Sequence, residues 1–94
     1  MEFEWDEAKR FGDLRKHGVD FIHVLDFDWE TAVRFEDNRR PYGELRWLAL
    51  GKIGERLHTL VYTIRRGRTR VISLRRSKRQ EVAVYEKTSR SSDA

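Results

Sequence analysis

The segment RWLALGKIGERLHTLVYTIRRGRTRVISLRR, residues 46–76, contains three apolar runs in quick succession. Each run is rich in leucine, β-branched or aromatic residues, and short turns with glycine separate the runs. Strands joined by such short turns pair in antiparallel fashion, because a tight turn cannot lead the chain into a parallel strand. The segment therefore predicts an antiparallel meander with strands over residues 46–53, 56–65 and 69–76.

Two further strands are expected before the meander. Residues 2–5, EFEW, alternate charged and apolar side chains, as a half-buried strand does, and residues 31–37, TAVRFED, form the other candidate. Residues 38–44, NRRPYGE, contain the only proline and predict a turn or loop.

Three helices complete the expected order. Asp6 is a suitable N-cap for a helix that runs through about Lys16 and ends at His17 and Gly18. A second helix over residues 21–28 begins after Asp20. Ser77 and Gln80 have the spacing of a capping box, which predicts a third helix through about Lys87.

The expected architecture is α+β, with an antiparallel sheet of about four to five strands, two N-terminal helices and one C-terminal helix. We expect one domain over residues 1–88 and a disordered polar tail over residues 89–94.

The charge is unevenly distributed along the chain. Residues 1–61 contain ten Lys or Arg and thirteen Asp or Glu, whereas residues 62–94 contain ten and three. A basic C-terminal third favours a polyanionic partner such as a nucleic acid, and an acidic protein surface is the second candidate.

Several classes of site and location are disfavoured. The chain has no cysteine, which excludes disulfides and thiolate metal sites. No apolar run approaches a membrane span and the N-terminus is acidic, so we expect a soluble, cytoplasmic protein without a membrane partner. The three histidines lie in three different predicted elements without metal-binding spacing, and no phosphate-binding glycine loop or nucleophilic serine motif is present. We therefore expect neither a metal ion nor another cofactor.

The most suggestive residues are His17 beside Lys16 and the arginines of residues 64–79. A histidine exchanges protons near neutral pH, but a histidine at a helix C-terminus is also a common stabilising feature. Arginine forks bind phosphate and stabilise charge on a phosphorane, although charged residues also protect sheet edges. The residues alone leave both interpretations open.

Two long segments, residues 3–21 (FEWDEAKRFGDLRKHGVDF) and residues 35–86 (FEDNRRPYGELRWLALGKIGERLHTLVYTIRRGRTRVISLRRSKRQEVAVYE), together resemble the BrnT family, the toxin half of a type II toxin–antitoxin pair. The residues that carry the resemblance are Trp5, Asp6, Lys9, Lys16, His17, Gly18, Phe21, Asp37, Tyr42, Gly43, Glu44, Arg46, Gly51, Val61, Tyr62, Thr63, Arg65, Gly67, Arg70, Ile72, Ser73, Arg75, Glu81 and Tyr85. The chain departs from the family pattern at Asp13, where asparagine is expected, and at Leu74 and Ser77 in place of alanines.

The resemblance implies a RelE-like fold and a ribonuclease that arrests translation. It also implies neutralisation by a BrnA-type antitoxin, through which the complex binds operator DNA, with a dimer or a heterotetramer as the assembly. We expect catalysis without a metal by Lys16, His17, Glu44, Arg65 and Arg75, with Tyr62 as an alternative proton-transfer group. RNA binding is assigned to Tyr62, Arg68, Arg70, Arg79 and Tyr85. The competing hypotheses are a non-catalytic RNA-binding module and a structural partner of an acidic peptide.

Overall fold

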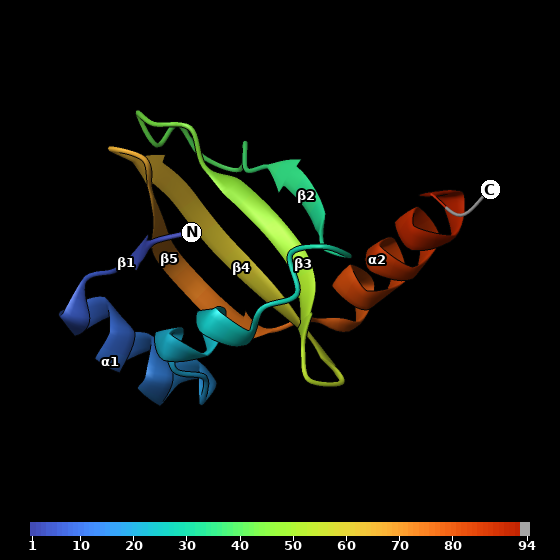
Figure 1. Cartoon of the computed structure of the whole chain (residues 1–94), viewed down its shortest axis with the longest axis horizontal. Coiled ribbons are helices and arrows are strands. Elements are labelled where there is room, and N and C mark those ends of the chain that lie inside the picture. Colours follow the sequence, from blue (N-terminus) through green and yellow to red (C-terminus); the bar gives the residue numbers. More distant parts are fainter. Residues whose placement is uncertain (93–94) are drawn as a thin grey trace.

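The computed structural model describes residues 1–92 and shows a five-stranded sheet with helices on its faces (Figure 1). In chain order the elements are β1 (Phe3–Glu4), α1 (Glu7–His17), the 3-10 helix η1 (Phe21–Asp26), β2 (Val33–Glu36), β3 (Trp47–Ile53), β4 (Arg56–Arg65), β5 (Arg68–Arg76) and α2 (Arg79–Ser92). The strand order across the sheet is β1-β5-β4-β3-β2.

The expected α+β class and the antiparallel meander are confirmed, since β2 to β5 all pair in antiparallel fashion. The exception is β1, which pairs with β5 in parallel, so that the sheet is mixed. No tight turn connects these two strands, so their pairing is not restricted to the antiparallel direction.

One face of the sheet carries the hydrophobic core. Val19, η1 and Phe27 pack on this face against side chains of β3, β4 and β5. The buried members are Val19, Phe21, Val24, Phe27, Ala49, Leu60, Tyr62, Val71 and Leu74. Burial of this apolar surface holds η1 and its flanking residues on the sheet. Helix α1, which has no buried residue, lies beside β5, and Figure 1 shows α1 and η1 at the same end of the molecule.

The other face is covered by the loop between β2 and β3 and by the first turns of α2. Thr63 donates its hydroxyl to the carbonyl oxygen of Leu45 at 2.6 Å, which ties the loop to β4. Helix α2 contacts β2 and β3, and its C-terminal half extends away from the sheet (Figure 1).

The first helix matches its sequence signals. Asp6 accepts a hydrogen bond from the backbone N–H of Lys9 at 3.2 Å, as an N-cap does. Gly18 ends the helix with a φ of 72°, a left-handed conformation in which glycine has no steric penalty.

The other two helices differ from the expectation. The segment expected as a helix over residues 21–28 is the shorter η1, because Phe27 turns to extended backbone and points into the core. The predicted capping box of Ser77 and Gln80 is wrong: Glu81 accepts from the N–H of Lys78 at 2.7 Å, while the Ser77 hydroxyl bonds to Thr59. Helix α2 also continues past Lys87 to Ser92, so residues 89–92 of the expected tail are helical, and residues 93–94 lie outside the described part.

Candidate functional site

The last turn of α1 places His17 at a basic depression, called here the His17 hollow. The depression lies where the end of α1, the end of β5 and the segment leading into α2 meet, and it is open to solvent. Its lining residues are Lys16, His17, Arg39, Arg75, Arg76 and Lys78. The structure thus brings the imidazole that follows the first helix together with a guanidinium group of the last strand.

The His17 side chain is half-buried, and none of the side chains described, those of residues 1–89, hydrogen-bonds its ring. The carbonyl of Leu14 is already bonded to the N–H of Gly18 at 2.8 Å. The imidazole is therefore available to a ligand in the hollow.

Arg75 is a cation of the His17 hollow that a carboxylate holds in place. Its Nη1 and Nη2 donate to Oε1 and Oε2 of Glu81 at 2.7 and 2.9 Å, and Nη1 also donates to the carbonyl of Arg76 at 3.3 Å. An arginine has five N–H donors in one plane. Within residues 1–92 the Nε–H and the second Nη2–H have no acceptor, and these two lie side by side as the fork that binds two oxygens of a phosphate.

Glu81 is a carboxylate held ionised beside this arginine. Burial by itself would raise the pKa of Glu81, but hydrogen bonds from Arg75, the N–H of Lys78 and the Thr59 hydroxyl, with the charge of Arg75, lower that pKa to about 2. Glu81 therefore fixes the guanidinium of Arg75 without acting as a base near neutral pH.

A second fixed arginine of the His17 hollow comes from the loop between β2 and β3. The Asp37 carboxylate is buried and accepts from Nε and Nη2 of Arg39 at 2.7 and 2.8 Å and from the Tyr42 hydroxyl at 3.2 Å. Hydrogen bonding to Arg39 lowers the pKa of Asp37 to about 2 despite its burial. These contacts hold the side chains of the loop together, and Arg39 lines the hollow.

Arg65 and Glu44, two of the expected catalytic residues, are not brought to the His17 hollow. Arg65 pairs with Arg68 at the tip of the β4–β5 hairpin, and Arg68 and Arg75 are separated by seven steps along β5, about 20 Å in an extended strand. The expected convergence of Arg65 with His17 is therefore not observed, because a single phosphodiester cannot contact both the hairpin tip and the His17 hollow. Hydrogen bonds from Arg65 at 2.8 Å and from Arg46 at 3.1 Å also lower the pKa of Glu44, which makes it a weaker base.

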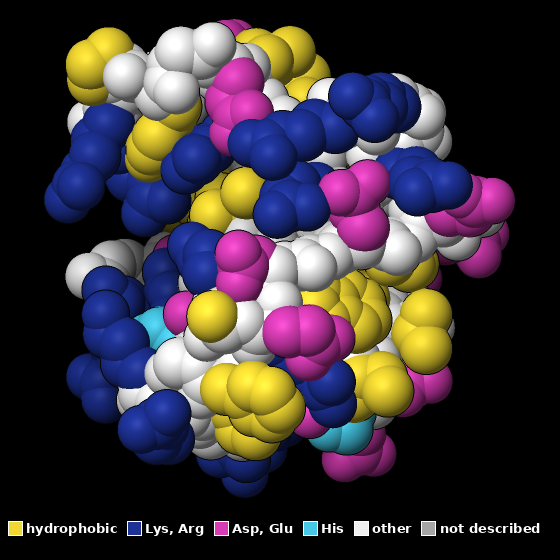
Figure 2. Space-filling model, turned by 90° about the vertical axis from the view of Figure 1, so that its left-hand side faces the viewer, with side chains coloured by type: hydrophobic (Ala, Val, Ile, Leu, Met, Phe, Trp, Pro, Cys, Tyr) yellow, Lys and Arg dark blue, Asp and Glu magenta, His cyan; other side chains and the backbone are white. Residues whose placement is uncertain are grey.

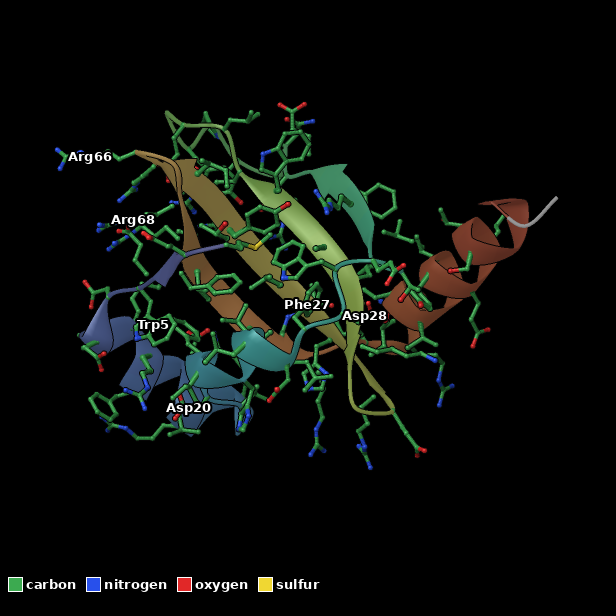
Figure 3. All side chains as sticks on the ribbon, in the orientation of Figure 1. Trp5, Asp20, Phe27, Asp28, Arg66 and Arg68 are labelled. Carbon is green, nitrogen blue, oxygen red and sulfur yellow. The ribbon has the colours of Figure 1, made fainter. Side chains whose placement is uncertain are left out.

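The expected RNA-binding residues are scattered. Tyr62 is buried with its ring 5.3 Å from that of Trp29, so it is unable to stack on a base, and burial raises its pKa. Arg68 and Arg70 lie towards the hairpin end, where Figure 3 labels Arg68 beside Arg66. Arg79 is exposed at the start of α2 and Tyr85 is half-buried on the same helix.

Ion pairing of the arginines and lysines differs in degree between the two ends of the sheet. At the hairpin end, Arg65, Arg68 and Arg70 are each bound to a carboxylate, those of Glu44, Glu2 and Glu4, at 2.7 to 3.1 Å. Arg66 at the hairpin tip is the exception, since within residues 1–92 it has no carboxylate partner. Figure 2, which views the molecule from the left-hand side of Figure 1, shows Asp and Glu side chains interspersed among Lys and Arg.

The cations of the His17 hollow are less compensated. Lys16, Arg76 and Lys78 are exposed, and among residues 1–92 none of them has a carboxylate partner. Unpaired positive charge attracts a polyanion more strongly than charge that is already neutralised. The end of the sheet with His17 is therefore the candidate nucleic-acid interface.

Sequence reasoning missed three lining residues of the hollow, Arg39, Arg76 and Lys78. Arg76 and Lys78 were detectable only as members of a general Arg-rich run, and Arg39 lies in a segment predicted as a loop.

Asp13, the departure from the family pattern, lies one helical turn before His17, and its Oδ2 is buried without a hydrogen-bond partner within residues 1–92.

The described residues form neither a metal-binding cluster nor a membrane-spanning helix. Across residues 1–92, no group of three or more His, Asp or Glu side chains is arranged to hold a metal ion. In the same part of the chain, no helix has both the length and the apolar character needed to cross a membrane.

Fold and site together define a small α+β protein with a basic, histidine-bearing hollow suited to a nucleic-acid backbone. Comparison with known families gives a match over residues 5–81 to the ribonuclease toxin, BrnT, of type II toxin–antitoxin systems. The chain belongs to this family of ribonuclease toxins. No curated protein matches it.

Proposed function

We propose that this protein is a toxin that cleaves RNA without a metal ion at the His17 hollow and thereby inhibits translation. The family supports an RNA target and a protein antitoxin as partner. The observation that carries the assignment to this hollow is the meeting of His17, the donor fork of Arg75 and three cations that have no carboxylate partner within residues 1–92.

Metal-free cleavage requires a base, a stabiliser of charge and a proton for the leaving oxygen. In our proposal, His17 takes the proton from a ribose 2′-hydroxyl, and the 2′-oxygen then forms a bond to phosphorus. The Nε–H and Nη2–H of Arg75 bind the non-bridging oxygens, with Lys16 adding positive charge. The bond from phosphorus to the 5′-oxygen breaks and water protonates that oxygen, which leaves a 2′,3′-cyclic phosphate and a 5′-hydroxyl.

The remaining residues of the His17 hollow serve to bind rather than to react. Arg39, Arg76 and Lys78 attract and hold the RNA backbone around the scissile phosphate. Glu44 and Tyr62 have no part in this mechanism, because one is ion-paired at the far end of the hairpin and the other is in the core.

The test is incubation of the purified protein with total RNA in the presence of a metal chelator, followed by analysis of the RNA ends. Metal-free cleavage predicts fragments with 2′,3′-cyclic phosphate and 5′-hydroxyl ends. RNA that is bound but intact would instead favour a non-catalytic binding module.

We further propose that the antitoxin is of the BrnA type and that the complex contacts operator DNA only through the antitoxin. The toxin would act in the cytoplasm, where its RNA target and its antitoxin are made. Mass measurement of the co-expressed pair distinguishes a dimer of the toxin from a heterotetramer with the antitoxin.

A further inference from the structure

A second depression adjoins the His17 hollow and is called here the His58 hollow. It is lined by the side chains of His23, Arg56, His58 and Arg76 together with Gly18, Val19 and Ile53. The two hollows share Arg76, and Gly18 directly follows His17 in the chain. They are therefore neighbouring parts of one surface.

The charge of the His58 hollow comes from two arginines. Arg56 and Arg76 are both exposed, and within residues 1–92 neither has a carboxylate partner. Of the Asp and Glu side chains in the described part of the chain, residues 1–92, none lines the hollow. Two guanidinium groups that are not engaged by a carboxylate are a donor set well suited to a phosphate group.

His58 adds a group of a different kind. It lies opposite Arg76 in the β4–β5 pairing and is 7% exposed. Its Nδ1 lies 2.9 Å from the carbonyl oxygen of Arg56, which can only accept, so Nδ1 carries the hydrogen and Nε2 has a free lone pair in the neutral ring. Burial, followed by the charges of Arg76, His23 and Arg56, lowers the pKa of His58 and favours this neutral form.

We infer that the His58 hollow is a subsite for the RNA phosphate next to the scissile one. Arg56 and Arg76 bind that phosphate, and Nε2 of His58 accepts a hydrogen bond from a ribose 2′-hydroxyl, the group that distinguishes RNA from DNA. Consecutive phosphates are joined by a single sugar, so their binding sites must adjoin, as these two hollows do through Arg76. The inference rests on the proposed function, since it places the cut phosphate in the His17 hollow.

The test measures binding rather than cleavage, so that it remains decisive even if the protein cuts nothing. The probe is a dinucleotide whose attacking 2′-hydroxyl is replaced by hydrogen, prepared without a terminal phosphate, with a 5′-phosphate, or with a 3′-phosphate. The dissociation constant of each is measured for the wild-type protein, for Arg56→Gln, and for Arg66→Gln as a matched control at the hairpin tip, where Figure 3 labels Arg66.

We expect one of the two terminal phosphates to tighten binding to the wild type at least about 10-fold, the factor that corresponds to the lower end of what a hydrogen bond to a charged group contributes. The gain should largely disappear in Arg56→Gln and persist in Arg66→Gln. The subsite is refuted if neither phosphate tightens binding to the wild type, or if Arg56→Gln keeps the full gain. Cleavage of ordinary RNA by the wild type is scored separately and tests the proposed function alone.

Discussion

The guanidinium of Arg75 and the carboxylate of Glu81 face each other in a two-point ion pair, with nitrogen–oxygen distances of 2.7 and 2.9 Å. The pair joins the last residues of β5 to the first turn of α2, and only 15% of the Arg75 side chain and 20% of the Glu81 side chain are exposed. One contact therefore both attaches a helix that has few other contacts with the sheet and orients the cation of the proposed active site.

The first prediction concerns the pH dependence of stability. The pKa of Glu81 is lowered from its ordinary 4.5 to about 2 in the folded protein, so its contribution is complete above about pH 5 and is lost as the pH falls towards 2. Glu81→Gln should lower the free energy of unfolding by about 2 kcal/mol at pH 7, and the difference from the wild type should shrink as the pH falls. Urea unfolding at several pH values measures both effects.

The control for this series is Glu86→Gln, an exposed carboxylate later on α2. It should change the free energy of unfolding little at any pH. A Glu81→Gln protein whose deficit stays constant between pH 7 and pH 3 would contradict the assigned role of the ionised carboxylate.

The second prediction uses two glycines in different surroundings. A Cβ at Gly51 would meet the ring of Phe27, with Cε1 only 2.7 Å away, whereas at Gly12 nothing lies within 4 Å. Gly51→Ala should destabilise the fold by roughly 1–3 kcal/mol through overpacking. Gly12→Ala should stabilise it by up to about 1 kcal/mol, because Gly12 lies inside α1.

Thermal unfolding of both variants measures whether stability falls in Gly51→Ala and rises in Gly12→Ala. Equal and small effects at the two positions would show that Phe27 does not pack on Gly51 in the way described.

The third prediction concerns salt. Each phosphate contact of a single-stranded RNA contributes about 0.7 to the slope of the logarithm of the binding constant against the logarithm of salt concentration. Lys78→Ala should reduce the magnitude of this slope by about that amount. Arg68→Gln should change it much less, since Arg68 is already paired with Glu2 at 3.1 Å. An equal change in both variants would show that RNA does not discriminate between the two ends of the sheet.

Local sequence signals predicted most of the fold. The turns around Gly54 and Gly67 predicted the meander, and the Asp6 cap with Gly18 predicted the first helix almost to the residue. Both kinds of signal are reliable because turns and helix caps depend mainly on residues that are close in the sequence. The parallel pairing of β1 with β5 and the 3-10 form of η1 were not predictable in this way. Both depend on contacts with distant parts of the chain, such as the packing of Phe27 on Gly51.

The candidate site was predicted in part for the same reason. Lys16, His17 and Arg75 come together as expected, whereas Arg65 does not, because the length and register of a hairpin decide which arginine reaches which end. The dispersed positions of His23 and His58 in the sequence concealed that both line one hollow. A one-dimensional pattern shows residue types but not which carboxylate neutralises which cation.

The most direct measurement for the central claim is the single-turnover rate of RNA cleavage in chelator for wild type, His17→Ala and Arg68→Gln, with folding checked by circular dichroism. We predict that His17→Ala loses at least about 100-fold in rate, as expected for a lost general base, while Arg68→Gln stays within a few-fold of the wild type. A folded His17→Ala protein that cleaves RNA at the wild-type rate would contradict the claim that RNA is cut at the His17 hollow.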